Sequence, residues 1–148
     1  MLEKEVIQYR GFRNTYDENG NPNGFEFRMR TTYYRGLWLS QLRVGSVYID
    51  GERILPDSGD ITWIIEGKEH TPAEMAEDNV DFWPMNKPVT VRVKKAGGLK
   101  QGYHDVWCTW GFSSSYMPPD MDQFKDEVDP KGFSMGGNPT KKRRMLIV

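Results

Sequence analysis

The side chains best able to bind a metal or move a proton are the two histidines, His70 and His104. A metal site built on imidazoles can use both only if the fold brings two distant segments together. Each has an acidic neighbour, Glu69 and Asp105, but consecutive residues of a strand point to opposite faces and cannot bind the same ion. Because a metal requires convergent ligands, we expect no metal site on this chain and a polar surface or interface role for both histidines.

Three other groups that resemble catalytic elements lack the surroundings that catalysis needs. Cys108 lies on the apolar side of an alternating pattern, which is typical of a small buried side chain and not of a nucleophile. The serines at 113–115 have neither the glycines of a nucleophile elbow nor a base beside them. The glycine pair at 97–98 lies in a predicted hairpin and not in a phosphate-binding loop. We therefore expect no catalytic residue on this chain.

The charge of the chain gives no reason to expect a polyanionic partner or a membrane surface. The sequence has 20 Lys and Arg residues against 21 Asp and Glu residues, so its net charge is −1. The basic run at 141–144 leads directly into an apolar segment, and no basic stripe accompanies it. We interpret this run as the solvated start of a strand or a contact to an acidic partner, and we expect no binding to nucleic acid or membranes.

Aromatic side chains outside the apolar pattern are the stronger binding candidates. Tyr103 and Trp107 lie opposite the apolar side of their strand, and Tyr34, Trp38 and Tyr116 lie in or near loops. Rings on a sheet face can stack on sugars or anchor a protein interface. They can also be buried without a function if both faces of the sheet are covered. The sequence leaves these uses open.

The elements that position these residues are strands. Between Gly24 and Tyr34, apolar side chains fall on odd positions and polar side chains on even positions, as in a strand with one buried face. The pattern recurs at 61–65, 89–93 and 106–112, between clusters of Gly, Pro and Asp. The sequence therefore predicts an antiparallel all-β chain.

Local signals refine this prediction. The first strand is expected over 5–13, and a change of parity at 45–46 predicts a bulge in a later strand. Thr71 followed by Pro72 and Glu74 predicts the start of one short helix, which should end by about Asn79. There the Thr hydroxyl caps the amide of Glu74, and the Glu carboxylate reaches back to the Thr amide.

The length of 148 residues predicts a single domain, 1–148. Periodicity fails over 117–140, which we interpret as a long irregular loop, functional or disordered, before a terminal strand at 141–148. The single cysteine excludes an internal disulfide, the N-terminus is too charged for a signal peptide, and no run reaches the length of a membrane span. We expect a soluble, cytoplasmic, bacterial protein.

Several short segments together resemble the small β subunit of bacterial C-glycoside deglycosidases. They span nearly the whole chain, and they are Tyr9–Asn14, Gly24–Arg28, Tyr33–Gly36, Val47–Gly51, Thr71–Met75, Gly97–Leu99, Gly102–His104 and Ser115–Pro118. The family pattern has an arginine shortly before the Ser-Tyr-Met-Pro element, where this chain has Phe112, Ser113 and Ser114. We therefore do not assign to that position of this chain the ligand or partner contact that the family's arginine could make.

The resemblance implies an antiparallel β-sandwich of about eight strands, with one short helix and a long loop before the last strand. It implies a partner, a TIM-barrel α subunit similar to sugar isomerases, in αβ heteromers. In that family the α subunit holds a divalent metal, usually manganese, and a catalytic histidine. The complex is a carbon–carbon lyase that separates an aglycone such as a flavonoid from a 3-oxo-sugar. This chain then needs no cofactor of its own.

On this hypothesis, contacts to the partner and to the wall of its active site are expected from two turns and from the long loop. The candidate residues are Tyr33, Tyr34, Arg35, Tyr116, Met117 and Pro118. The alternative is a stand-alone carbohydrate-binding module that stacks sugars on Trp38, Tyr103 and Trp107. A third possibility is a structural β-sandwich that serves a different enzyme of the same barrel class.

Overall fold

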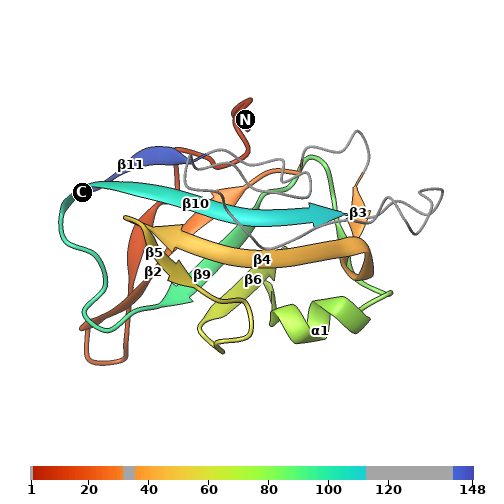
Figure 1. Ribbon diagram of the computed structural model, residues 1–148, viewed down its shortest axis with the longest axis horizontal. Helices are drawn as coiled ribbons and strands as arrows, with labels where there is room; N and C mark the ends of the chain where they lie inside the picture. Colours follow the sequence, from red (N-terminus) through yellow and green to blue (C-terminus); the bar gives the residue numbers. More distant parts are fainter. Residues whose placement is uncertain (1, 32–35, 113–141) are drawn as a thin grey trace.

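The computed structural model describes residues 2–31, 36–112 and 142–148, and within them the strands form two facing antiparallel sheets (Figure 1). One sheet has the order β1 (Arg13–Tyr16), β2 (Pro22–Met29), β9 (Val89–Lys94), β6 (Ile61–Ile65) and β7 (Lys68–His70). The other has the order β11 (Arg143–Ile147), β10 (Gly102–Phe112), β4 (Leu42–Ile49) and β5 (Glu52–Ile54). A third, small sheet pairs β3 (Leu37–Trp38) with β8 (Phe82–Trp83), beside the helix α1 (Pro72–Glu77) and the 3₁₀ turn η1 (Leu39–Gln41).

This architecture confirms the prediction of an antiparallel all-β fold with one short α-helix, since every strand pairing in the described residues is antiparallel. The expected number of about eight strands is too low, because the described residues form eleven. Four of these (β3, β5, β7 and β8) have only two or three residues. A segment that short cannot display the alternation from which strands are predicted. Neither helix of the described residues is long and apolar enough to cross a bilayer.

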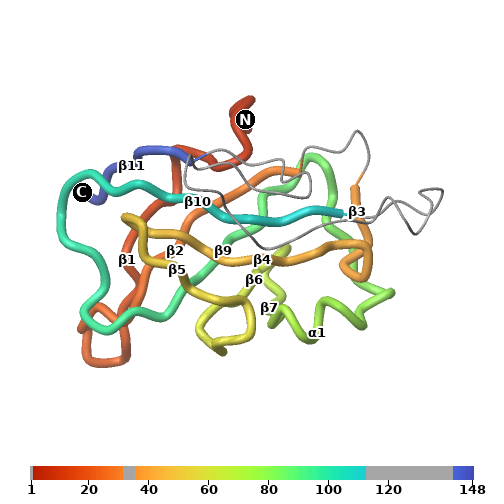
Figure 2. The backbone as a smooth tube through the Cα atoms, in the orientation of Figure 1, coloured from red at the N-terminus to blue at the C-terminus, as the bar shows by residue number. Residues whose placement is uncertain are grey.

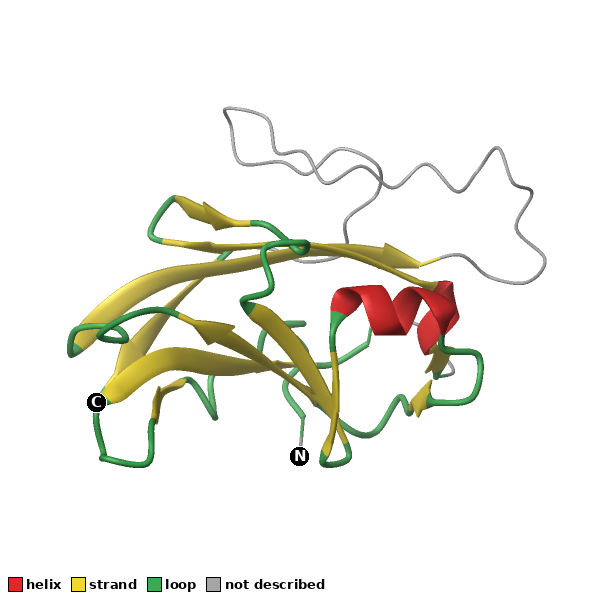
Figure 3. Cartoon of the chain, turned by 90° about the horizontal axis from the view of Figure 1, so that it is seen from below, coloured by secondary structure: helices red, strands yellow, loops and turns green. Residues whose placement is uncertain are grey.

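The hydrophobic core lies between the two sheets, which Figure 3 shows as two layers. Phe25, Phe27 and Met29 of β2 are fully buried, as their odd positions predicted. The core is built on large rings: Trp63, Trp83 and Trp110 contact one another, with ring centroids 5.3–6.4 Å apart.

Not all side chains at the even positions of β2 are exposed to solvent, contrary to the sequence prediction. Glu26 is only 4% exposed and accepts hydrogen bonds from Arg13 at 2.7 Å and from Arg92 at 3.1 Å. A carboxylate can be buried when neighbouring strands supply cations, because the pairing offsets the loss of hydration. Hydrophobic alternation carries no information about such cross-strand partners.

The bulge predicted at 45–46 is present in β4. Between Cys108 and Trp110 the β10 strand advances by two residues, while its partner β4 advances by three, from Val47 to Val44. The extra residue restores the inward direction of the apolar side chains on both sides of it.

The first strand differs from its prediction over 5–13. The chain turns at Gly11, whose φ is +88°, and the strand β1 begins only at Arg13. Before that turn, Ile7 forms an isolated bridge to Met29. A left-handed glycine conformation ends a strand, so Gly11 separates two segments. At the other end of the chain, β11 pairs with β10, which confirms the terminal strand.

Candidate functional site

One end of the sandwich is closed by α1, η1 and the small β3–β8 sheet (Figure 1). We call this region, residues 36–41 and 68–85, the α1 end. Its two segments are distant in sequence but share backbone hydrogen bonds, such as the one from Leu39 N–H to Asp81 C=O at 3.1 Å. They therefore form one structural unit.

Helix α1 begins where the sequence predicted. The Thr71 hydroxyl accepts a hydrogen bond from the Glu74 N–H at 3.2 Å, and Pro72 occupies the first turn. The Glu74 carboxylate contacts the Thr71 hydroxyl at 3.1 Å and not the Thr71 amide, so the capping box is only partly as expected. The helix ends at Glu77, and Asp78 follows it with an extended backbone.

Exposed apolar side chains gather on the strands and loops of the α1 end. Trp38 and Phe82 lie opposite each other in the β3–β8 pair, with ring centroids 5.0 Å apart, yet they remain 47% and 38% exposed. Val80 and Met85, within three residues of Phe82 in sequence, are 78% and 54% exposed. Backbone geometry supports this arrangement, because a Cβ at Gly36 would overlap the Phe82 ring. Large exposed rings that are held in place are typical of protein interfaces.

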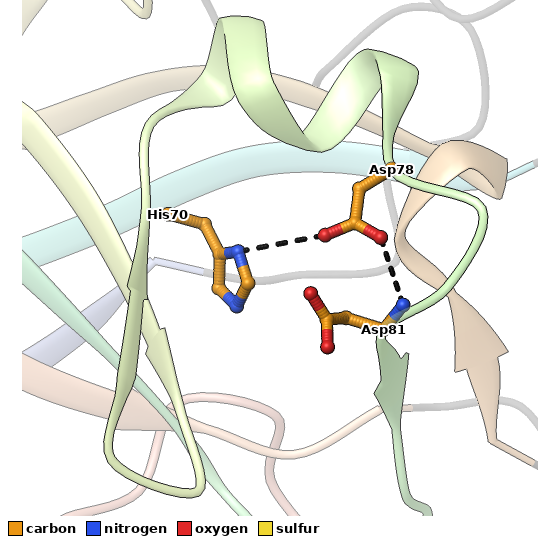
Figure 4. A group of neighbouring side chains, drawn as sticks. All are labelled: His70, Asp78 and Asp81. Carbon is orange, nitrogen blue, oxygen red and sulfur yellow. Dashed lines mark hydrogen bonds and ion pairs between the residues drawn. The ribbon is translucent and has the colours of Figure 1, made fainter.

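A group of titratable side chains lies beside α1 in the same region (Figure 4). His70, Asp78 and Asp81 place ligand-type atoms within 4.8 Å of one another. His70 is 3% exposed, and its Nδ1 lies 3.7 Å from Asp78 Oδ2. Lys68 Nζ donates to Asp81 Oδ2 at 2.7 Å.

The loop after α1 fixes the carboxylate of Asp78. Its Oδ1 accepts hydrogen bonds from the N–H groups of Asp81 at 2.8 Å and Val80 at 2.9 Å. The hydrogen bonds from Asp81, followed by the one from Val80, lower the pKa of Asp78 to about 2. Asp78 is therefore an anion at neutral pH, and it fixes the backbone that presents Val80 and Phe82.

The second histidine lies in a different environment. His104 Nδ1 contacts Asp50 Oδ2 at 2.6 Å, and Nε2 contacts the Lys100 C=O at 2.7 Å. Burial opposes charge on both side chains, but the hydrogen bonds between them and to the backbone outweigh it. They raise the pKa of His104 and lower the pKa of Asp50. This pair links the β4–β5 turn to β10 as an ion pair.

Comparison with known proteins assigns the family. The C-glycoside deglycosidase beta subunit family matches residues 2–116, a range that contains the whole α1 end. A C-glycoside deglycosidase beta subunit from Eubacterium cellulosolvens is 45% identical over 152 residues, which cover 99% of this chain and 100% of that protein. The chain belongs to the C-glycoside deglycosidase beta subunit family.

Membership in this family confirms the resemblance found in the sequence. The family description names a subunit, so a C-glycoside deglycosidase beta subunit works in a complex with a partner subunit. Of the residues expected at that contact, all six lie outside the described part of the chain: Tyr33, Tyr34, Arg35, Tyr116, Met117 and Pro118. The predicted long loop at 117–140 lies outside it as well.

The three rings of the sugar-stacking alternative do not form one platform. Tyr103 is 61% exposed, with the Arg144 guanidinium 5.7 Å from its ring centroid, and Trp38 is also exposed. Trp107, however, is only 4% exposed, and its ring lies 5.7 Å from that of Tyr48, so its expected exposure is wrong. Alternation along a strand assigns a side chain to a face but does not say whether that face is covered.

The remaining two rings are also far apart. Figure 2 shows β3, which carries Trp38, at the opposite end of the molecule from the start of β10, which carries Tyr103. A sugar stacked on one ring cannot reach the other. The geometry of this beta subunit therefore favours the α1 end as the candidate site.

The sequence prediction missed the approach of Asp78 and Asp81 to His70. It considered only His104 and Glu69 as possible co-ligands of His70, and Glu69 instead pairs with Arg92 on the sheet surface. The available signal was the predicted helix α1, which connects His70 to Asp78 within eight residues of sequence.

Proposed function

We propose that this chain is the non-catalytic β subunit of a heteromeric C-glycoside deglycosidase and that it binds the catalytic α subunit through the α1 end. The α subunit is a metal-dependent TIM barrel in this proposal, and the complex is a carbon–carbon lyase that acts on 3-oxo-C-glycosides. The β subunit stabilises the α subunit and helps to wall its active site. The observation that carries the docking surface is the exposed Trp38–Phe82 pair, with Val80 and Met85 close by in sequence.

The reaction needs groups that belong in the partner. A 3-keto group acidifies the neighbouring C2–H of the sugar, and a base that removes this proton drives elimination of the aglycone from C1. A divalent metal that polarises the sugar oxygens, manganese in this proposal, lowers the barrier further. The β subunit contributes shape and stability to that cleft.

The docking surface fits a protein partner better than a small ligand. Aromatic side chains of this size bury about 150–250 Å² each when they are covered. Aromatic anchors near the centre of an interface commonly contribute at least about 2 kcal/mol each to binding. A partner that covers Trp38 and Phe82 removes both rings from water at once, while their mutual contact keeps the loss of side-chain entropy small.

The test is co-purification with the proposed TIM-barrel α subunit. Trp38→Ser and Phe82→Ser should each weaken the αβ complex by at least about 10-fold in Kd. Gly36→Ala should weaken it too, because the added Cβ overlaps both the Phe82 ring and the Trp83 carbonyl and so disturbs the β3–β8 pair. Tyr16→Ser is the matched control, since Tyr16 is a 61% exposed ring on β1 and should leave binding unchanged.

Two results would contradict this function. Undiminished binding by the Trp38→Ser, Phe82→Ser double variant would remove the α1 end as the interface. Turnover of a 3-oxo-C-glycoside by the isolated chain, at the rate of the complex, would disprove the non-catalytic role.

A further inference from the structure

Three segments of the α1 end direct a ligand-type side chain into one space. His70 ends β7, Asp78 caps α1, and Asp81 immediately precedes β8 (Figure 4). The imidazole nitrogen and one oxygen from each carboxylate lie within 4.8 Å of one another. These atoms come from elements that are joined by a helix and a loop, so their convergence is a property of the fold.

The imidazole is the decisive member of this group. His70 is 3% exposed, and within the described residues its ring forms no hydrogen bond. Its Nδ1 lies 3.7 Å from Asp78 Oδ2, which is longer than a hydrogen bond. Two ligands bound at about 2.0–2.1 Å to one tetrahedral ion lie roughly 3.4 Å apart. The observed separation is therefore close to that of two ligands that share a cation.

In each carboxylate, one oxygen accepts hydrogen bonds that fix the position of the side chain. Asp78 Oδ1 receives two backbone N–H groups, so Oδ2 faces His70. Asp81 Oδ2 receives the Lys68 ammonium, and the Asp81 side chain also lies within hydrogen-bonding reach of the Asp78 carboxylate. Ligands whose remaining atoms are already bonded need little reorientation to bind an ion.

We propose that His70, Asp78 and Asp81 bind a divalent transition-metal cation, with water completing its coordination. One nitrogen and two oxygen donors favour Zn²⁺ over the harder Mg²⁺. The ion links β7, the end of α1 and the start of β8, so it acts structurally and fixes the loop that carries Val80. Its binding is independent of the proposed function, while its effect on partner docking rests on that function.

Lys68 provides an electrostatic test of the proposal. Its ammonium neutralises part of the charge of the two neighbouring carboxylates, so it competes with a bound cation. Removing the ammonium should therefore strengthen metal binding. Because any pair of carboxylates gains affinity for cations when a neighbouring ammonium is removed, this change tests only the electrostatics of the site, and the ligand variants test whether the site is built.

The experiment uses the full chain without a tag, treated with a chelator and titrated calorimetrically with Zn²⁺, Mn²⁺ and Mg²⁺ in turn. The expected result is one Zn²⁺ site per chain, weaker binding of Mn²⁺ and no binding of Mg²⁺. Titration with Co²⁺ gives a second readout, because its visible absorption reports coordination by nitrogen and oxygen ligands.

The variants separate a built site from adventitious binding. Asp81→Asn, a partly exposed position that should fold, is expected to lower the Zn²⁺ affinity at least about 10–100-fold. Lys68→Gln should raise it. His104→Gln removes the other histidine and should leave it unchanged.

The proposal is overturned if the wild-type chain gives neither heat with Zn²⁺ nor a Co²⁺ spectrum. It is equally overturned if Asp81→Asn binds Zn²⁺ as the wild type does, or if His104→Gln abolishes binding. These measurements need no α subunit, so their failure would leave the docking surface of the proposed function standing.

Discussion

The two histidine–aspartate pairs of this chain use the same chemical groups in opposite ways. His104 and Asp50 are in direct contact at 2.6 Å, and the second ring nitrogen of His104 is satisfied by the Lys100 carbonyl. His70 and Asp78 are separated by 3.7 Å, although His70 is the more buried histidine. We call His104 and Asp50 the closed pair, because their side chains bond directly to each other. We call His70 and Asp78 the open pair, because the gap between their side chains leaves room for another atom.

The difference comes from the segments that hold each aspartate. Asp50 sits in the β4–β5 turn, where its second oxygen accepts the Asp105 N–H and thereby draws the turn toward β10. Asp78 caps a helix, and the two backbone N–H groups of its own loop hold it back from His70. A closed pair stabilises a fold, whereas an open pair that is fixed in place is suited to a ligand.

The largest expected difference between the pairs is their response to Zn²⁺. At a free concentration of 100 times Kd, a ligand that binds only the folded state adds about 2.7 kcal/mol to the free energy of unfolding. We expect that gain in His104→Gln, where the open pair is intact, and at most about 1.4 kcal/mol in Asp81→Asn, whose Zn²⁺ affinity should be at least about 10-fold lower. Urea denaturation with and without Zn²⁺ measures it. Equal gains in the two variants would mean that the pairs do not differ in this way.

The next effect appears without any metal. His104→Leu leaves Asp50 and the Lys100 carbonyl without their shared partner, which should cost about 1–3 kcal/mol in the free energy of unfolding. His70→Leu removes no hydrogen bond of the described residues, because Asp78 keeps its two backbone donors, and should be nearly neutral. Chemical denaturation in chelator-treated buffer compares the two. A larger loss for His70→Leu would show that the open pair is itself a stabilising contact.

The sequence predicted those parts of the fold that depend on local periodicity. The buried face of β2, the bulge in β4, the Thr71 cap and the terminal strand all follow from a residue and its near neighbours. The short strands β3, β7 and β8 and the buried Glu26 were not predictable in this way. They exist because of partners distant in sequence, which periodicity does not report.

The candidate site was predicted least well, for the same reason. Neither the facing of Trp38 and Phe82 nor the approach of Asp78 to His70 is visible in any single segment, since each needs the turn of α1 and the pairing of β3 with β8. Burial of Trp107 likewise depends on what covers the sheet. The family assigns the function class, and the geometry is the basis on which we propose the α1 end as the docking surface.

The smallest expected effect is a loss of stability toward alkaline pH at the closed pair, since the lowered pKa of Asp78 in the open pair acts only at acid pH. The folded-state pKa of His104 is raised above 6.5, so its stabilising contribution is complete below pH 6.5 and is lost as the pH rises through the raised value. The folded-state pKa of Asp50 is lowered below 3.8, so its contribution is present above pH 3.8 and is lost as the pH falls through the lowered value. The pair is therefore most stabilising between pH 3.8 and 6.5.

This window can be measured as the difference in unfolding free energy between the wild type and His104→Gln across a pH series. The difference should be largest between those two values and should shrink toward alkaline pH, as His104 loses its proton in the folded chain. Asp81→Asn, which leaves the closed pair intact, should follow the wild-type profile over the same alkaline range. If the difference stayed constant through neutral pH, His104 would be held to Asp50 as a neutral imidazole, and hydrogen bonding alone would distinguish the closed pair from the open one.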